Sequence, residues 1–145
     1  MRLPPAAPAG QFVLFGHIKS LTRGRRRFLL RFDPALFLSG ETANRAAVED
    51  KVISPGDAVP NDSYVLEEGH RAVAYFVWPS AQVTVITNGG TAGLTSTRIT
   101  VAELAQIVKG KNPRHRPLFD RARGLGFWIR VSIDTVRELD QQYHP

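Results

Sequence analysis

Residues 100–110 read TVAELAQIVKG and describe a short amphipathic helix with a signal at each end. Thr100 and Glu103 have the spacing of a capping box, in which each residue can satisfy an unpaired backbone amide of the other. The apolar side chains of the segment fall on one side, and they are Val101, Leu104, Ala105, Ile107 and Val108. The lysine and glycine that end the segment are typical of a helix C-terminus. We therefore expect one well-capped helix at about 101–109.

Apolar residues alternate before and after this helix, and alternation predicts β-strands. The expected strands cover residues 11–21, 27–32, 64–66, 72–78, 81–87 and 127–133, with a last strand or packed tail at 136–143. In 72–78 both alternating sets are apolar, which predicts burial on both faces. In 127–133 the inward set is expected to be Phe127, Ile129, Val131 and Ile133. Gly16, inside the first strand, predicts a bulge or a bend.

Strand breakers divide these segments. Asp33 and Pro34 together resemble a helix start and predict one helical turn that ends at Leu38. A weaker helix is expected at about 42–50. Pro79 and the serine after it predict a turn, and the Pro/Gly/Asn-rich stretches that separate the remaining elements predict loops.

Strands that outnumber helices in this order favour an α+β fold. The expected architecture is a small, partly closed antiparallel β-barrel, and the oligonucleotide/oligosaccharide-binding (OB) barrel is one specific candidate. A chain of 145 residues predicts one domain, here residues 11–145, after a Pro/Ala-rich leader at 1–10.

Composition sets further limits on the class of protein. Hydrophobic residues make up 43% and charged residues 22%, as in ordinary soluble globular proteins. Cysteine is absent, which excludes disulfides and thiol chemistry. No apolar run approaches the ~20 residues that span a bilayer, and residues 1–10 lack the apolar stretch of a signal peptide. The compartment stays open, and an extracytoplasmic location is expected if Met1 is not the natural start.

Charge is distributed unevenly along the chain. The net charge is +6, and residues 1–31 hold seven basic and no acidic side chains, whereas residues 32–70 hold two basic and eight acidic ones. Two basic clusters are the candidate ligand-binding residues, one made of Arg23, Arg25, Arg26 and Arg27 and the other containing Lys111, Arg114 and Arg116. If both clusters meet on one face, they would attract phosphate or another polyanion. A solvated, solubilising surface is the alternative interpretation.

Single-strand binding also requires exposed aromatic side chains between the charges. The aromatic residues near the clusters in sequence are Phe28 and Phe119, and Phe28 is expected in the core. Trp78 and Trp128 fall on predicted strands, where tryptophan is usually a core anchor; an exposed one could stack on a sugar or a base. Nucleic acid is therefore a possible partner that the sequence does not favour.

A loop supplies the candidate catalytic residues. Asp62, Glu67 and His70 could act as general acid and base if a pocket brought them together. The same residue types are common in turns, where they cap backbone or face water. Nucleophile motifs are missing, the four histidines lack metal-ligand spacing, and no metal or cofactor is expected.

Four segments carry a resemblance to other proteins. They are GHIKSL at 16–21, FDPA at 32–35, VPNDSYV at 59–65 and DTVRELDQQY at 134–143. In these the chain resembles, over most of residues 12–145, a group of uncharacterised bacterial proteins from high-GC genomes. Its members look like secreted proteins or lipoproteins with a Pro/Ala/Ser linker before a small β-rich domain. The group has no assigned activity, so the resemblance assigns no site residue, and this chain differs by lacking a signal sequence.

The sequence thus predicts a non-enzymatic binding or interaction domain, with an anionic ligand or polymer slightly preferred. One alternative is a small hydrolase or isomerase that uses the 61–70 loop. A structural or assembly protein is the other.

Overall fold

The structure is a computed structural model that describes residues 10–39, 63–67, 72–119 and 126–142. The structural statements below concern these residues. The elements, in chain order, are β1 (Gln11–Arg23), β2 (Phe28–Ser39), β3 (Ser63–Glu67), β4 (Val73–Asn88), the short 3₁₀ helix η2 (Gly90–Ala92), β5 (Leu94–Ile99), α2 (Val101–Val108), β6 (Phe127–Ser132) and β7 (Thr135–Gln141).

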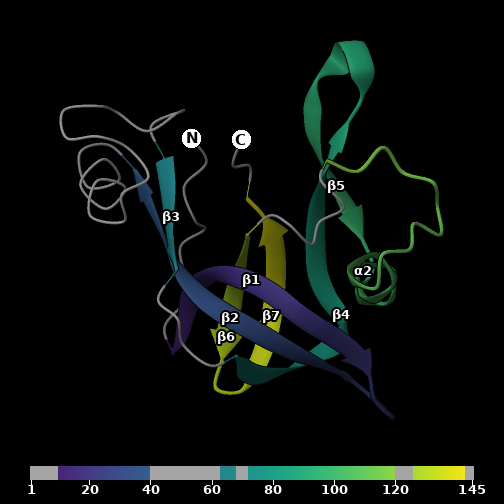
Figure 1. The fold of residues 1–145 in the computed structure, drawn as a ribbon. Helices are drawn as coiled ribbons and strands as arrows, with labels where there is room; N and C mark the ends of the chain where they lie inside the picture. The colour runs from purple at the N-terminus through teal and green to yellow at the C-terminus, as the bar shows by residue number, and fades with distance from the viewer. Residues whose placement is uncertain (1–9, 40–62, 68–71, 120–125, 143–145) are drawn as a thin grey trace.

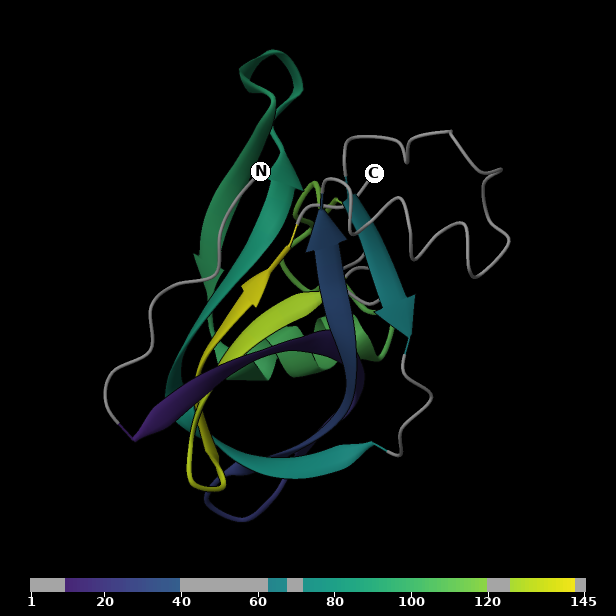
Figure 2. The same cartoon turned by 90° about the vertical axis from the view of Figure 1, so that its left-hand side faces the viewer.

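Five strands close into a barrel in the order β1–β2–β4–β7–β6, and β6 pairs back with β1. Every pairing in this ring is antiparallel except β4–β7, which is parallel. β3 pairs with the far end of β2, and β5 pairs with the second half of β4. Figures 1 and 2 show the curved strands around a common interior, with α2 beside them and the β4–β5 hairpin projecting away. The predicted small β-barrel with one capped helix is confirmed, and the parallel β4–β7 pair makes the barrel mixed rather than wholly antiparallel as expected.

The chain passes through the ring in a Greek-key order. Counted along the chain, the five barrel strands are neighbours in the order first, second, third, fifth and fourth, and α2 lies between the third and the fourth. This connectivity is that of an OB-type barrel.

The core lies inside the ring and under α2. All five apolar residues predicted for one side of the helix are buried, and the helix packs against β1 and β4. A register shift between Ile18 and Ser20 makes Lys19 an extra residue in the β1–β2 pairing. Because of this bulge, Ile18 and Leu21 both enter the core although they are three residues apart.

Gly16 lies outside that bulge and serves a different purpose. A Cβ atom at Gly16 would lie 2.2 Å from the backbone oxygen of Asp33. Glycine is therefore required here by the close approach of the β1 and β2 backbones.

The helical turn predicted from Pro34 to Leu38, with Asp33 as its cap, is wrong, because β2 continues as a strand through Pro34 to Ser39. Pro34 pairs with Gly16 of β1 on one side. On the other side the register with β4 ends at Phe32, and the register with β3 begins at Ala35. The proline thus occupies a gap between two partner strands, where a missing amide hydrogen removes no hydrogen bond of a continuous ladder.

β4 also continues through a predicted break. The turn expected at Pro79 is wrong, since Val73–Asn88 is one strand. Its pairing with β7 is irregular between Val77 and Gln82, and the proline lies inside this irregular stretch. The first half of β4 therefore pairs with β2 and the second half with β5.

Two predicted burial patterns are wrong. Ile133 lies in the turn after β6 rather than in the core; it is 86% exposed and has a φ of 60°, a backbone region that β-branched residues rarely adopt. The outer set of 72–78 is not buried, because Trp78 is 41% exposed and Phe76 is half-buried. The expected helix at 42–50 lies outside the described residues. Within the described chain, no helix is long and apolar enough to cross a membrane.

Candidate anion-binding site

The turn between β1 and β2 projects a run of arginines. The backbone amide of Gly24 donates to the carbonyl oxygen of Arg27 at 2.8 Å and closes the turn. A Cβ at Gly24 would lie 2.7 Å from that oxygen, so glycine permits the tight approach. Arg25 and Arg26, at the tip of the turn, are exposed.

Arg27 folds back over β4. Its guanidinium carbon lies 3.5 Å from the centroid of the Phe76 ring and 5.8 Å from that of Trp78. The guanidinium carbon of Arg23 lies 5.7 Å from the ring centroid of Phe28. A cation at such distances is attracted by the negative face of an aromatic ring. The contacts of Arg27 connect the arginine turn to β4, and that of Arg23 joins the end of β1 to the start of β2.

The outer face of β2 and β4 continues from this turn. Leu29 pairs with Phe76 across the two strands, and Trp78 follows two residues farther along β4. Leu29 is 39% exposed. Side chains alternate between faces, so Phe28 and Val77 point into the core while these neighbours point outward.

A hollow of about 490 Å³ lies between the turn and this outer face. Its lining residues are Gly24, Arg25, Arg26, Arg27, Phe28, Leu29, Phe76 and Trp78. The volume lies within the ~300–1,000 Å³ that is usual for small-molecule sites. The lining combines cationic and aromatic side chains and contains no carboxylate.

Two other cations of the barrel are paired with carboxylates. Nη2 of Arg130 lies 2.8 Å from Oε1 of Glu138, and Nζ of Lys19 lies 3.7 Å from Oδ2 of Asp33. No such pair is found for the arginines of the turn within the part of the chain that is described. The turn therefore keeps positive charge that its described neighbours do not neutralise.

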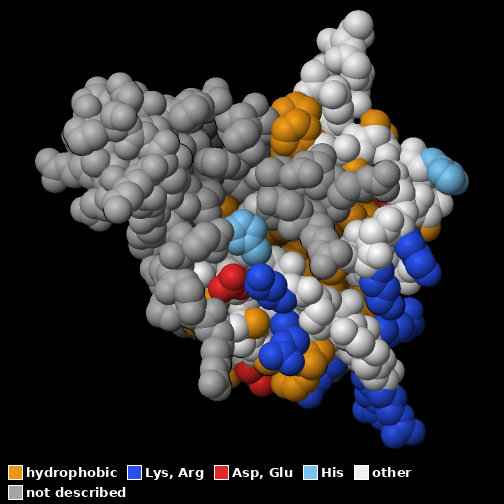
Figure 3. Space-filling view, viewed as in Figure 1, with side chains coloured by type: hydrophobic (Ala, Val, Ile, Leu, Met, Phe, Trp, Pro, Cys, Tyr) orange, Lys and Arg blue, Asp and Glu red, His pale blue; other side chains and the backbone are white. Residues whose placement is uncertain are grey.

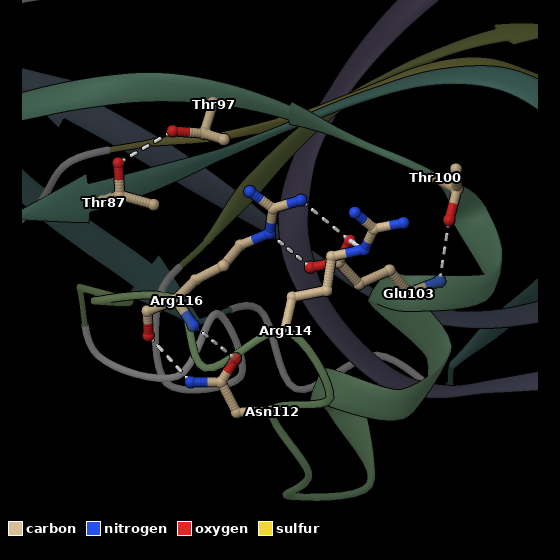
Figure 4. Close-up of polar contacts among 7 residues, drawn as sticks. All are labelled: Thr87, Thr97, Thr100, Glu103, Asn112, Arg114 and Arg116. Carbon is tan, nitrogen blue, oxygen red and sulfur yellow. Dashed lines mark hydrogen bonds and ion pairs between the residues drawn. The ribbon is translucent and has the colours of Figure 1, made fainter.

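The second basic cluster is organised differently (Figure 4). Nε and Nη2 of Arg116 donate to the two carboxylate oxygens of Glu103 at 2.5 and 3.1 Å. This hydrogen bond raises the pKa of Arg116 above its usual range, against an opposing effect of burial. Nε of Arg114 lies 3.7 Å from the same carboxylate, although its side chain is 72% exposed. Arg116 therefore serves to hold the loop to α2 rather than to offer a free charge.

Asn112 fixes the same loop. Its amide nitrogen donates to the carbonyl oxygen of Arg116 at 2.7 Å, and its amide oxygen accepts from the Arg116 backbone amide at 3.0 Å. Lys111 is exposed. None of Lys111, Arg114 and Arg116 lines the hollow. Lys and Arg side chains nevertheless gather on one side of the molecule, from the level of α2 down to the β1–β2 turn (Figure 3).

The structure describes only one of the three candidate catalytic residues. Glu67 ends β3, whereas Asp62 and His70 lie outside the described residues. The enzyme hypothesis therefore stays a prediction. Among the residues that the structure places, no group of three or more His, Cys, Asp and Glu side chains could hold a metal ion.

The sequence predicted the arginines of the hollow as a cluster but did not place Phe76 and Trp78 beside them. Phe76 and Trp78 come from β4, about fifty residues farther along the chain. The alternation in 72–78 shows two apolar faces but not which of them a neighbouring layer covers. The one local signal that could have pointed to an exposed position is the place of Trp78 directly before Pro79, since a proline favours an irregular strand.

No family model, no curated protein and no solved structure matches this chain. The resemblance to the bacterial group described above therefore stays a prediction.

Proposed function

We propose that this domain is a non-enzymatic binding module that takes an anionic ligand or polymer in the hollow beside the β1–β2 turn. The observation that carries the proposal is the lining of the hollow, in which Arg25, Arg26 and Arg27 meet aromatic side chains without a carboxylate. A guanidinium binds phosphate, sulfate or carboxylate groups with two parallel hydrogen bonds, so a cluster of three suits a ligand with several anionic groups.

The position of the hollow gives independent support by analogy. OB-type barrels bind oligonucleotides and oligosaccharides on the face formed by their second and third strands and on the adjoining loop between the first two strands. The corresponding parts here are β2, β4 and the Gly24–Arg27 turn, which together line the hollow. Because one fold hosts many functions, the arginines of the hollow carry the proposal, and the fold gives it only secondary support.

A pair of double variants tests the proposal. Arg25→Gln with Arg26→Gln removes two charges from the hollow, and Lys109→Gln with Lys111→Gln removes two exposed charges from the region after α2. Binding of fluorescein-labelled heparin is measured by anisotropy over a series of salt concentrations. We expect the first pair to weaken binding about tenfold, since two exposed contacts of roughly 0.7 kcal/mol each add to that factor.

The control pair is expected to weaken binding by less than about twofold, through the general field alone. Equal losses in both double variants would contradict a defined site and favour a solubilising charge spread over the surface. No binding of heparin by the unmodified protein at low salt would remove the proposal.

A further inference from the structure

We infer that the ligand of the hollow is a single-stranded nucleic acid, held by its phosphates on the arginines and by a base on Trp78. This inference rests on the proposed function and names its ligand class. Three features of the outer face of β2 and β4 carry it: the spacing of the cations, the exposed aromatic beside them at the Arg27 end and the flat guanidinium of Arg27.

The cations extend beyond the hollow along β2. Arg27, Leu29 and Arg31 follow one another at every second position, and Leu29 and Arg31 are exposed on the outer face. Arg31 pairs with Ala74, whose small side chain leaves the surface beside it open. Arg31 lies four positions after Arg27, a distance of about 13 Å in an extended chain. One compact anion cannot contact both ends of this row, whereas a chain of phosphates can.

An aromatic surface lies beside this row of cations. Trp78 lies on the outer face of β4 next to Phe76, and its side chain is 41% exposed. Aromatic side chains between cationic groups are the pattern by which proteins bind single strands, because every base has a face that stacks on a ring. In a duplex those faces are covered by neighbouring base pairs. The combination therefore favours unpaired bases over a double helix.

Arg27 adds a second flat surface. The Phe76 ring covers one side of the guanidinium group, whose carbon lies 3.5 Å from the ring centroid. The guanidinium is planar, and bases stack on arginine planes as they do on aromatic rings. An acidic peptide or a sulfated sugar would use the charges of this surface without needing flat groups that accept a base.

The first experiment measures binding of a fluorescein-labelled oligothymidylate of ~15 nucleotides, a length that covers the usual site of one OB-type barrel. Trp78→Ala is compared with Leu94→Ala, which removes a similarly exposed apolar side chain (42%) from β5, opposite Asn88. We expect Trp78→Ala to weaken binding about 5- to 100-fold, as the loss of one stacked base does, and Leu94→Ala to leave it unchanged. Trp78→Phe keeps a ring and should retain most of the affinity.

A second comparison tests the row of cations. Arg31→Gln is set against Arg98→Gln, an exposed arginine of β5 that lies opposite Thr84, six residues along β4 from Trp78. Losing one phosphate contact should lower the slope of log affinity against log salt by about 0.7 for a single strand. Arg98→Gln should leave the slope unchanged, and a duplex of the same sequence should compete at least about tenfold less well than the single strand.

The outcomes separate the two proposals. If heparin binding depends on Arg25 and Arg26, but the duplex competes as well as the single strand and Trp78→Ala changes nothing, the nucleic-acid inference is overturned and the proposed function stands. If neither heparin nor the oligonucleotide binds, the proposed function itself fails. Circular dichroism confirms the fold of each variant. Should Trp78→Ala fail to fold, quenching of tryptophan fluorescence by the oligonucleotide, reduced in Trp78→Phe, decides the question, and no quenching overturns the inference.

Discussion

The guanidinium carbon of Arg27 lies 3.5 Å from the centroid of the Phe76 ring, so the turn after β1 is held against the outer face of β4. Phe76 is fixed in turn, because its backbone amide donates to the carbonyl oxygen of Asp134 in the β6–β7 turn at 2.8 Å. One arginine of the turn thereby has a structural contact, while Arg25 and Arg26 remain exposed at the tip.

The Arg27–Phe76 contact should be measurable as a coupling energy. We predict that a double-mutant cycle of Arg27→Gln and Phe76→Leu, followed by urea unfolding, gives a coupling of about 0.5–2 kcal/mol, the range for a cation on a partly buried ring. The matched cycle of Arg26→Gln with Phe76→Leu should give a coupling within about 0.5 kcal/mol of zero. Equal couplings in both cycles would show that the Arg27–Phe76 contact makes no specific contribution to the free energy of unfolding.

The Thr100 cap of α2 should contribute to stability. The Thr100 hydroxyl oxygen accepts from the backbone amide of Glu103 at 3.0 Å. Thr100→Ala should lower the free energy of unfolding by about 1 kcal/mol, whereas Thr100→Ser, which keeps the acceptor, should lower it by much less. Thermal or urea unfolding of the three proteins gives the comparison, and an alanine variant as stable as the serine variant would speak against the cap.

The two arginines on Glu103 should differ in what they contribute to stability. Glu103 is buried, with 7% exposure, and Arg116 contacts both of its oxygens, whereas the largely exposed Arg114 lies at 3.7 Å. Arg116→Gln should therefore destabilise the domain by about 1–3 kcal/mol, because it leaves a buried carboxylate without its main partner. Arg114→Gln should cost no more than about 0.5 kcal/mol. Urea unfolding compares the two, and a reversed order would contradict the assignment of Arg116 as the structural residue.

Tyr75 should make the domain less stable in alkali. Burial of its side chain on β4 raises the pKa of the phenol above the usual value of about 10. Between the unfolded and the folded pKa, the unfolded chain has released this proton while the folded one retains it, so stability is full below pH ~10 and falls as the pH rises through the folded value.

Tyr75→Phe should remove this part of the alkaline loss. Urea unfolding at a series of pH values from 8 upward (roughly to 11, so as to cross the usual phenol pKa) compares the variant with the unmodified protein. Parallel stability curves for the two proteins would show that the phenol of Tyr75 does not titrate differently on folding.

Local signals predicted the helix and most of the barrel. The spacing of Thr100 and Glu103 and the apolar side of the segment between them fixed α2, because capping and periodicity act within a few residues. The strand through Pro34 was missed, since Asp-Pro is a good helix start by itself, and only its pairing with Gly16 of β1 selects the strand. Local patterns also cannot show that β4 and β7 pair in parallel.

In the candidate site, too, local sequence signals predicted some residues, whereas others depend on contacts between distant segments. The arginines of the β1–β2 turn lie close together in sequence, so their cluster could be predicted from the chain. Phe76 and Trp78 reach them only because β2 pairs with β4, a contact between distant segments. Arg116 was assigned to the ligand-binding set for its charge, and its engagement by the buried Glu103 becomes visible only in three dimensions.

The most direct measurement of the central claim is a titration of the ¹⁵N-labelled domain with single-stranded oligothymidylate, followed by amide and indole chemical shifts. A single anion-binding face beside the β1–β2 turn predicts shifts that concentrate at Gly24–Leu29, Arg31, Phe76 and the Trp78 indole, and that vanish at high salt. Shifts that instead centre on Lys111–Arg116, or that spread evenly over all exposed basic residues, would contradict it.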